Sequence, residues 1–154
     1  MTLIRLKFKI LVLVFLLSNS LSAQDYDEKR ISSLIDSINN DDLVGTCKYV
    51  WTIELDKEAR AAMELIEIGR LVSNDLIDAL SNPRKGIIAH YILSKTWFER
   101  MGISSEYRAT SEVAFTMNEL QFIQGSNEFI VESSELTDRQ IYWKFYLRNK
   151  LGDH

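Results

Sequence analysis

Cysteine and proline are almost absent from this chain of 154 residues, which contains one of each, Cys47 and Pro83. A single cysteine cannot form a disulfide within the chain, so packing and hydrogen bonds have to hold the fold. The neighbours of Cys47 in "LVGTCKYVW" are mostly apolar. We therefore expect its side chain to be a buried small hydrophobe rather than a reactive thiol.

Motifs that carry common chemistry are also missing from the sequence. The chain has only two histidines, His90 and the C-terminal His154, and its glycines stand singly. Zinc sites are generally built from several histidine or cysteine ligands, and phosphate loops need clustered glycines. No GxSxG segment is present to supply a nucleophilic serine. We expect no metal, no cofactor and no assembled catalytic set.

Basic charge is in short supply as well. The whole chain has a formal net charge of −4, and residues 24–154 carry 15 basic against 22 acidic side chains, a net charge of −7. Proteins that bind nucleic acid or anionic membranes need basic surface to displace counterions from phosphate. This balance argues against both functions.

What the sequence does have at its N-terminus is the pattern of a secretory signal peptide. Three basic residues fall within the first nine, an apolar run covers residues 10–17, and "SNSLSA" brings small residues up to Ala23. Eight apolar residues span roughly 12 Å as a helix, against about 30 Å of hydrocarbon, so no stable membrane anchor is expected after cleavage. We expect export to the periplasm or medium, with residues 24–154 forming one domain.

Helical periodicity dominates most of the remaining chain. Apolar residues recur at helical spacing after Tyr26, a run of strong helix formers follows Asp56 and ends at Gly69, and "DLIDAL" follows Ser73 or Asn74 as a possible cap. A longer helix is predicted over residues 84–102. Residues 43–55 are rich in valine, threonine and aromatics, and their pattern fits either a strand or a helical turn.

The segment "KEARAAMELIEIGRLVSNDLIDALSNPRKGIIAHYILSKTWF", residues 57–98, resembles one unit of a HEAT-like helical repeat. Small and apolar residues line two successive helical segments, and Asn82-Pro83 marks the turn after them. The chain departs from the family pattern in having Gly86 where an arginine is usual, and no second copy of the unit is present. The resemblance implies a compact helical domain with one such hairpin, whose relatives serve as interaction scaffolds, rather than an extended array.

The C-terminal third changes character before it closes with a helix. Apolar residues alternate at Leu120 and Phe122 and again at Phe129 and Val131, with Gly125 between the two runs, which predicts a short β-hairpin. In "TDRQIYWKFYLRNKLG", Thr137 and Gln140 have the spacing of a capping box and Gly152 follows as a stop, which predicts a final helix. The predicted fold is thus mainly α: a small helical domain with a HEAT-like hairpin, a short C-terminal β-hairpin and a closing helix.

His90 is the strongest candidate for catalysis, since it could act as a general base beside a carboxylate of residues 64–78. Its neighbours are apolar, however, and a buried histidine can give its ring nitrogens to nearby polar groups. The carboxylate pairs Glu64/Glu67 and Asp75/Asp78 share one helical face each, which is also the pattern of an ordinary solvated surface. We therefore expect a core histidine and no catalytic residue.

The last helix is the best candidate for a binding surface. Residues 24–136 carry a net charge of −9, whereas residues 137–154 carry +2. Its apolar and aromatic residues wrap too far round the helix to fit one buried stripe, so some are expected either to fill a groove of this domain or to meet a partner protein. The residues assigned to binding are Tyr142, Trp143, Tyr146 and Arg148. The alternative, that the helix only closes the core, stays open.

These observations favour an exported, non-enzymatic protein-binding or inhibitor-like module. The alternative function is a small hydrolase-type enzyme that uses His90 with a nearby carboxylate.

The signal pattern makes a direct prediction about the exported protein. Cleavage after Ala23 gives a chain that begins at Gln24, because the small residues at the end of the apolar run fit the signal peptidase site. Intact-mass measurement of protein recovered from the exported fraction checks this start. A mass that still includes residues 1–23 contradicts it.

Overall fold

The computed structural model describes residues 28–47, 51–107, 113–125 and 128–152. The chain divides into two units, Met1–Ser33 and Leu34–His154. Of the first unit, the described residues belong to a helix that spans residues 28–37. The predicted signal peptide and its cleavage site lie outside the described residues. The second unit contains every other described element.

The prediction of a mainly α fold is wrong, because the second unit is a mixture of helices and antiparallel sheet. One sheet has two strands in the order β1-β2, and the other has four in the order β3-β4-β5-β6. The strands are β1 (Leu43–Cys47), β2 (Trp51–Leu55), β3 (Ile103–Tyr107), β4 (Val113–Met117), β5 (Leu120–Gln124) and β6 (Phe129–Ile130). The helices, with two short 3-10 turns labelled η, are η1 (Asn40–Asp42), α2 (Arg60–Ile68), η2 (Gly69–Val72), α3 (Ser73–Ala79), α4 (Gly86–Trp97) and α5 (Ser133–Gly152).

The predicted helices exist, but several of their ends differ from the sequence prediction. Helix α2 stops before Gly69, whose φ of +75° is one that glycine adopts readily. Ser73 does not cap α3 but donates its hydroxyl hydrogen to the Arg70 carbonyl. Helix α5 begins four residues before Thr137, whose hydroxyl instead donates back to the Ser133 carbonyl. Ser73 and Thr137, which have the spacing of helix caps in the sequence, therefore form hydrogen bonds to preceding carbonyls and do not cap a helix.

The sequence pattern of residues 43–55 fitted either a strand or a helical turn. In the structure, strands β1 and β2 of this segment pair antiparallel. Cys47 ends β1 and is exposed, so the prediction of a buried thiol is wrong. Burial decreases along β1, from buried Leu43 to exposed Thr46 and Cys47. Cys47 is therefore exposed although its even spacing from Leu43 places both on one face of the strand. Local composition did not reveal where along the strand the core ends.

The predicted C-terminal hairpin corresponds to the pairing of β5 with β6, but it is part of the larger sheet. Strands β4 and β5 are joined by the two-residue turn Asn118-Glu119, in which both residues have positive φ. Asn118 and Gly102 share two hydrogen bonds, each 2.8 Å long. The backbone N–H of Asn118 donates to the Gly102 carbonyl, and the backbone N–H of Gly102 donates to the side-chain oxygen of Asn118. The buried residues of β4 and β5 alternate along each strand and form one apolar face: Val113, Phe115, Met117, Leu120 and Phe122.

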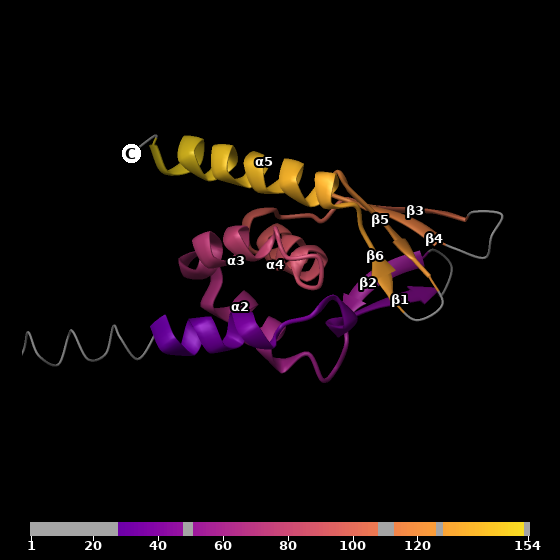
Figure 1. The fold of residues 1–154 in the computed structure, drawn as a ribbon, viewed down its shortest axis with the longest axis horizontal. Coiled ribbons are helices and arrows are strands. Elements are labelled where there is room, and N and C mark those ends of the chain that lie inside the picture. The colour runs from indigo at the N-terminus through magenta and orange to yellow at the C-terminus, as the bar shows by residue number, and fades with distance from the viewer. Residues whose placement is uncertain (1–27, 48–50, 108–112, 126–127, 153–154) are drawn as a thin grey trace, which may run out of the picture. The chain divides into compact units, whose positions relative to one another are not determined.

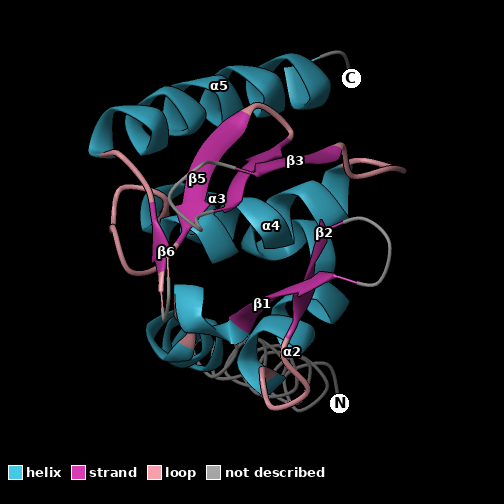
Figure 2. Ribbon diagram, turned by 90° about the vertical axis from the view of Figure 1, so that its right-hand side faces the viewer, coloured by secondary structure: helices cyan, strands magenta, loops and turns pink. Residues whose placement is uncertain are grey.

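Helix α4 forms the centre of this unit. Its residues from Gly86 to Ser94 are all buried, and it contacts α2, α3 and α5. Figures 1 and 2 show α5 lying along α3 and α4, with the four-stranded sheet beside them. Gly86 permits the close approach of α5, because a Cβ at this position would lie 2.6 Å from a methyl carbon of Leu136 and 2.7 Å from the Leu80 carbonyl oxygen.

A helix buried on all sides needs partners for the free N–H groups of its first turn. Asn40, far upstream in the sequence, supplies them: its side-chain oxygen accepts hydrogen bonds from the amides of Ile87 and Ile88, at 3.0 and 3.2 Å. The side-chain nitrogen of Asn40 donates to the Pro83 carbonyl at 2.7 Å, and the backbone N–H of Asn40 donates to the Arg84 carbonyl, also at 2.7 Å. One buried side chain thus joins η1 to the turn before α4 and to the helix start.

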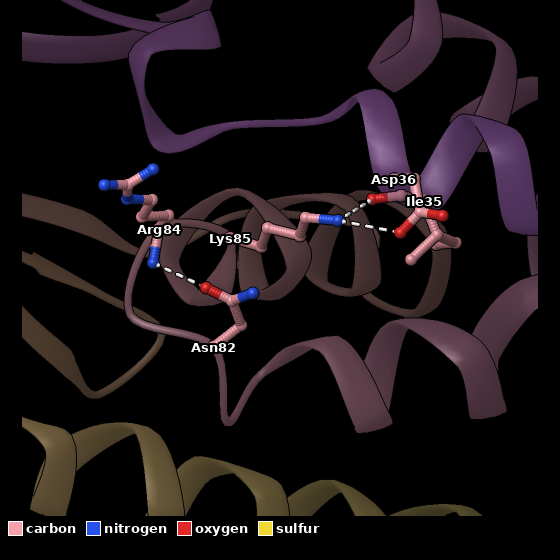
Figure 3. Close-up of polar contacts among 5 residues, drawn as sticks. All are labelled: Ile35, Asp36, Asn82, Arg84 and Lys85. Atoms are coloured by element: carbon pink, nitrogen blue, oxygen red, sulfur yellow. Dashed lines mark hydrogen bonds and ion pairs between the residues drawn. The ribbon is translucent and has the colours of Figure 1, made fainter.

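The turn before α4 is also joined to the C-terminal end of the helix over residues 28–37 (Figure 3). The Lys85 ammonium donates to the Ile35 carbonyl at 2.8 Å and pairs with the Asp36 carboxylate at 3.2 Å. A cation is favourable at the C-terminal end of a helix, where the last carbonyls lack partners. Within the turn, the Arg84 amide donates to the Asn82 side chain at 2.9 Å.

We predict that Asn40→Ala lowers the free energy of unfolding by about 2 to 4 kcal/mol, because it removes a helix cap and leaves the buried amides of Ile87 and Ile88 without their acceptor. Chemical denaturation measures the change. Asn39→Ala is the matched control: Asn39 caps only the short turn η1, so about 1 kcal/mol or less is expected. Equal losses in the two variants would contradict the special role of Asn40.

Candidate functional site

The inner face of α5 is fixed by a chain of two buried hydrogen bonds. The indole N–H of Trp143 donates to Nδ1 of His90 at 3.0 Å. Since an indole can only donate, Nδ1 must be the acceptor, and the proton of the neutral ring sits on Nε2. Nε2 then donates to the Met117 carbonyl at 2.8 Å. Helices α5 and α4 and the end of strand β4 are joined through one imidazole.

His90 is fully buried, with 0% of its surface exposed. Burial lowers its pKa from 6.5 to about 4, and nearby Arg139 adds to the lowering, while the Met117 and Asn118 hydrogen bonds and the Glu119 carboxylate oppose it. A proton on Nδ1 would also face the Trp143 N–H and break that bond. His90 is therefore neutral near pH 7 and held in one tautomer by its neighbours.

This geometry gives no support to a catalytic His90. Both ring nitrogens are occupied within the core, and no substrate can reach them in this structure. Glu67, Asp75 and Asp78, three of the carboxylates considered as its partners, are exposed on the surface. In the part of the chain that the structure describes, no group of three or more His, Cys, Asp or Glu side chains could hold a metal ion.

The four residues assigned to binding from the sequence have different environments. Trp143 is fully buried, Tyr142 and Tyr146 are partly buried, and Arg148 is exposed. Tyr146 packs edge-on against Trp97 and Phe98, with ring centroids 6.0 and 5.5 Å apart. Trp143 thus belongs to the core, and Arg148 is the fully exposed member of the predicted set.

Tyr142 lies at the margin of this aromatic cluster. The Arg139 guanidinium lies over its ring at 5.3 Å and pairs with the Glu119 carboxylate at 2.9 Å. Partial burial raises the pKa of the Tyr142 hydroxyl, the Glu119 carboxylate raises it further, and the Arg139 guanidinium opposes the rise. The hydroxyl therefore stays protonated at neutral pH.

The outer face of α5 carries exposed apolar side chains that the binding assignment missed. Ile141 is 61% exposed and Phe145 is 65% exposed, and their spacing of four residues places them side by side on the helix. Lys144 and Arg148 are exposed on the same helix beside them. The sequence held a signal for this face, because Leu136, Trp143 and Leu147 recur at intervals of seven and four residues and mark the opposite side as buried.

A groove of about 580 Å³ lies at the C-terminal end of α5, next to η2 and the end of α4. Its apolar walls include Leu71, which is 82% exposed, and Leu151, which is 65% exposed. The residues lining it are Arg70, Leu71, Ser73, Asn74, Trp97, Tyr146, Leu147, Lys150 and Leu151. No carboxylate is among them, although the chain as a whole is acidic. We refer to this feature as the α5 groove.

Comparison with known proteins found no match, either to protein-family models, to curated proteins or to solved structures. Among the described residues, no helix is both long and apolar enough to cross a membrane.

The depressed pKa of His90 predicts a loss of stability in mild acid. Because the unfolded chain takes up the proton below pH 6.5 and the folded protein only near pH 4, the contribution of neutral His90 is complete above pH 6.5 and is lost as the pH falls toward 4. Between pH 7 and pH 5 the free energy of unfolding should fall by about 2 kcal/mol from this group.

Urea unfolding at the two pH values measures the loss, and His90→Gln is the control, since glutamine has an acceptor and a donor but does not titrate. The variant should lose about 2 kcal/mol less than the wild type over this interval. The same pH dependence in both proteins would assign the effect to other groups.

Proposed function

We propose that this chain is an exported, non-enzymatic module that binds another protein through helix α5. The observation that carries the proposal is the distribution of exposed apolar side chains. The large hydrophobic residues exposed among the described residues are Met63, Leu71, Ile130, Ile141, Phe145 and Leu151. Half of them lie on α5, and Leu71 lines the groove at its end. Exposed apolar groups gathered on one element are typical of an interaction surface.

The charges around these side chains indicate the character of the partner. Between Ile141 and Leu151, α5 carries Lys144, Arg148 and Lys150 and no acidic residue. The rest of residues 24–154 is strongly acidic. A surface of this composition fits a partner that presents apolar side chains flanked by carboxylates, because complementary charges speed the encounter and disfavour wrong partners.

In this proposal, residues 57–98 act as the scaffold that carries α5, which is the role suggested by their resemblance to a HEAT-like hairpin. One contact that supports this role joins α5 to α3, where the Gln140 side chain donates to the Ile77 carbonyl at 2.9 Å. The buried Trp143-His90 bond joins α5 to α4. A helix held at several points presents its outer face without a large loss of conformational entropy on binding.

A photo-crosslinking amino acid at position 145 tests the proposal. In cells that export the protein, we expect a discrete protein adduct from position 145 and none from the exposed position of Glu58, the matched control. Ile141→Ser should reduce the adduct on the order of tenfold, the effect of losing an apolar contact of about 1.4 kcal/mol. High salt should reduce it as well, because exposed charge pairs are screened.

An adduct whose yield is insensitive to Ile141→Ser and to salt, or one that forms equally from position 58, would count against α5 as the docking surface. Ile141 and Phe145 are exposed, so their replacement should leave the thermal unfolding temperature almost unchanged.

A further inference from the structure

The α5 groove has a rigid floor built from side chains that hold one another in place. The Trp97 indole N–H donates to the Ser73 hydroxyl at 2.9 Å, and that hydroxyl donates to the Arg70 carbonyl at 2.8 Å. Tyr146 packs edge-on against the Trp97 ring. Because these residues are locked by hydrogen bonds and packing, a ligand would not have to order them on binding.

Two cations border this floor. The Arg70 guanidinium stacks over the Trp97 ring, with its central carbon 4.4 Å from the ring centroid. Stacking covers one face of the guanidinium and leaves N–H groups at its edge able to donate. In the described part of the chain, neither Arg70 nor Lys150 forms an ion pair with a carboxylate. Two cations without acidic partners are notable in a protein with an excess of acidic residues.

The apolar side chains complete the geometry. Leu71 comes from η2 and Leu151 from the last turn of α5, and both line the same groove. Each exposes more than half of its surface to water, which forgoes the roughly 1.5 to 3 kcal/mol that full burial of a leucine contributes. A ligand that places an apolar group between them would recover part of that free energy.

We infer that the α5 groove binds a linear acidic segment of the partner protein: an aliphatic side chain of the segment packs between Leu71 and Leu151, and its neighbouring carboxylates pair with Arg70 and Lys150. This inference rests on the proposed function and specifies the chemistry of the partner. An anionic membrane is the less suitable occupant, because membrane-bound helices sort their apolar and basic groups onto opposite faces. Here the cations and leucines line one groove.

Fluorescence anisotropy with three short fluorescein-labelled peptides tests the inference on the exported chain. The first contains leucine and glutamate, the second has glutamine in place of glutamate, and the third has alanine in place of leucine. We expect the first peptide to bind at least about tenfold more tightly than the other two, since each loses one of the two contacts.

Protein variants separate the groove from general charge effects. Arg70→Glu combined with Lys150→Glu should weaken binding of the first peptide at least about tenfold. Lys57→Glu combined with Arg60→Glu makes the same change in net charge at two exposed positions, one in the turn before α2 and one at the start of α2, and should alter binding less than about twofold. Leu71→Ser should also weaken binding about tenfold, without loss of stability, because Leu71 is 82% exposed.

Three results would overturn the inference: no binding of the first peptide up to about 1 mM, the weak end of specific affinities; equal binding of the glutamine peptide; or equal weakening by the control charge reversals. Binding to phosphatidylglycerol vesicles but to none of the peptides would also overturn it and identify a membrane surface. A position-145 adduct without peptide binding would leave docking on α5 standing and reject the groove alone. Peptide binding lost in the groove variants supports the inference whether or not that adduct forms.

Discussion

The hydrogen-bond chain from Trp143 through His90 to Met117 is the constraint on which the arrangement of α5 depends. A neutral imidazole has one donor and one acceptor, and here the acceptor meets the indole of α5 while the donor meets a strand carbonyl. Because both partners are buried, neither can exchange this bond for water without a large cost. Together with the packing of Leu136 and Leu147, the bond holds one face of α5 against the core, and Ile141 and Phe145 on the opposite face point outward. The same His90 that the sequence offers as a possible catalyst is instead a core residue that holds Trp143 of the last helix inward.

A second polar constraint holds the N-terminal end of α4. The side-chain oxygen of Asn40 accepts both hydrogen bonds at the helix start, from a segment 47 residues away in sequence. Buried hydrogen bonds at the start and in the middle of α4 give specificity that hydrophobic packing alone does not provide, since leucine and isoleucine tolerate many packings. The unit without disulfides thus relies on a few buried polar side chains for a unique arrangement of α4, α5 and the sheet.

The sequence predicts helices well here and strands poorly, for a physical reason. Helix α4 is apolar over most of its circumference and α2 has a strong amphipathic pattern, so both are visible locally. Strand β3, by contrast, reads Ile-Ser-Ser-Glu-Tyr and has little pattern of its own; its pairing with β4 depends on long-range register. The alternation of Val113, Phe115 and Met117, with the two-residue turn that follows, was a local signal for β4 that the sequence prediction missed. The inward position of His90 could be inferred from its apolar neighbours, whereas its bond to Trp143 joins residues 53 apart and could not.

The same difference between local and long-range information explains the outcome for the binding residues. Charge asymmetry is a property of composition, so the sequence alone could single out the last helix as a basic surface on an acidic protein. Which face of that helix is exposed depends on tertiary packing: Trp143 turns inward, and the apolar residues left in water are Ile141, Phe145 and Leu151. Leu71 and Leu151 are far apart in the sequence and line the same groove only in the folded protein. Exposed leucine, isoleucine and phenylalanine side chains on a stable helix favour aggregation unless they are covered. A partner that covers them with apolar groups and neutralises the neighbouring cations therefore satisfies two physical requirements of the surface together, and this is the strongest reason to regard α5 as a binding element.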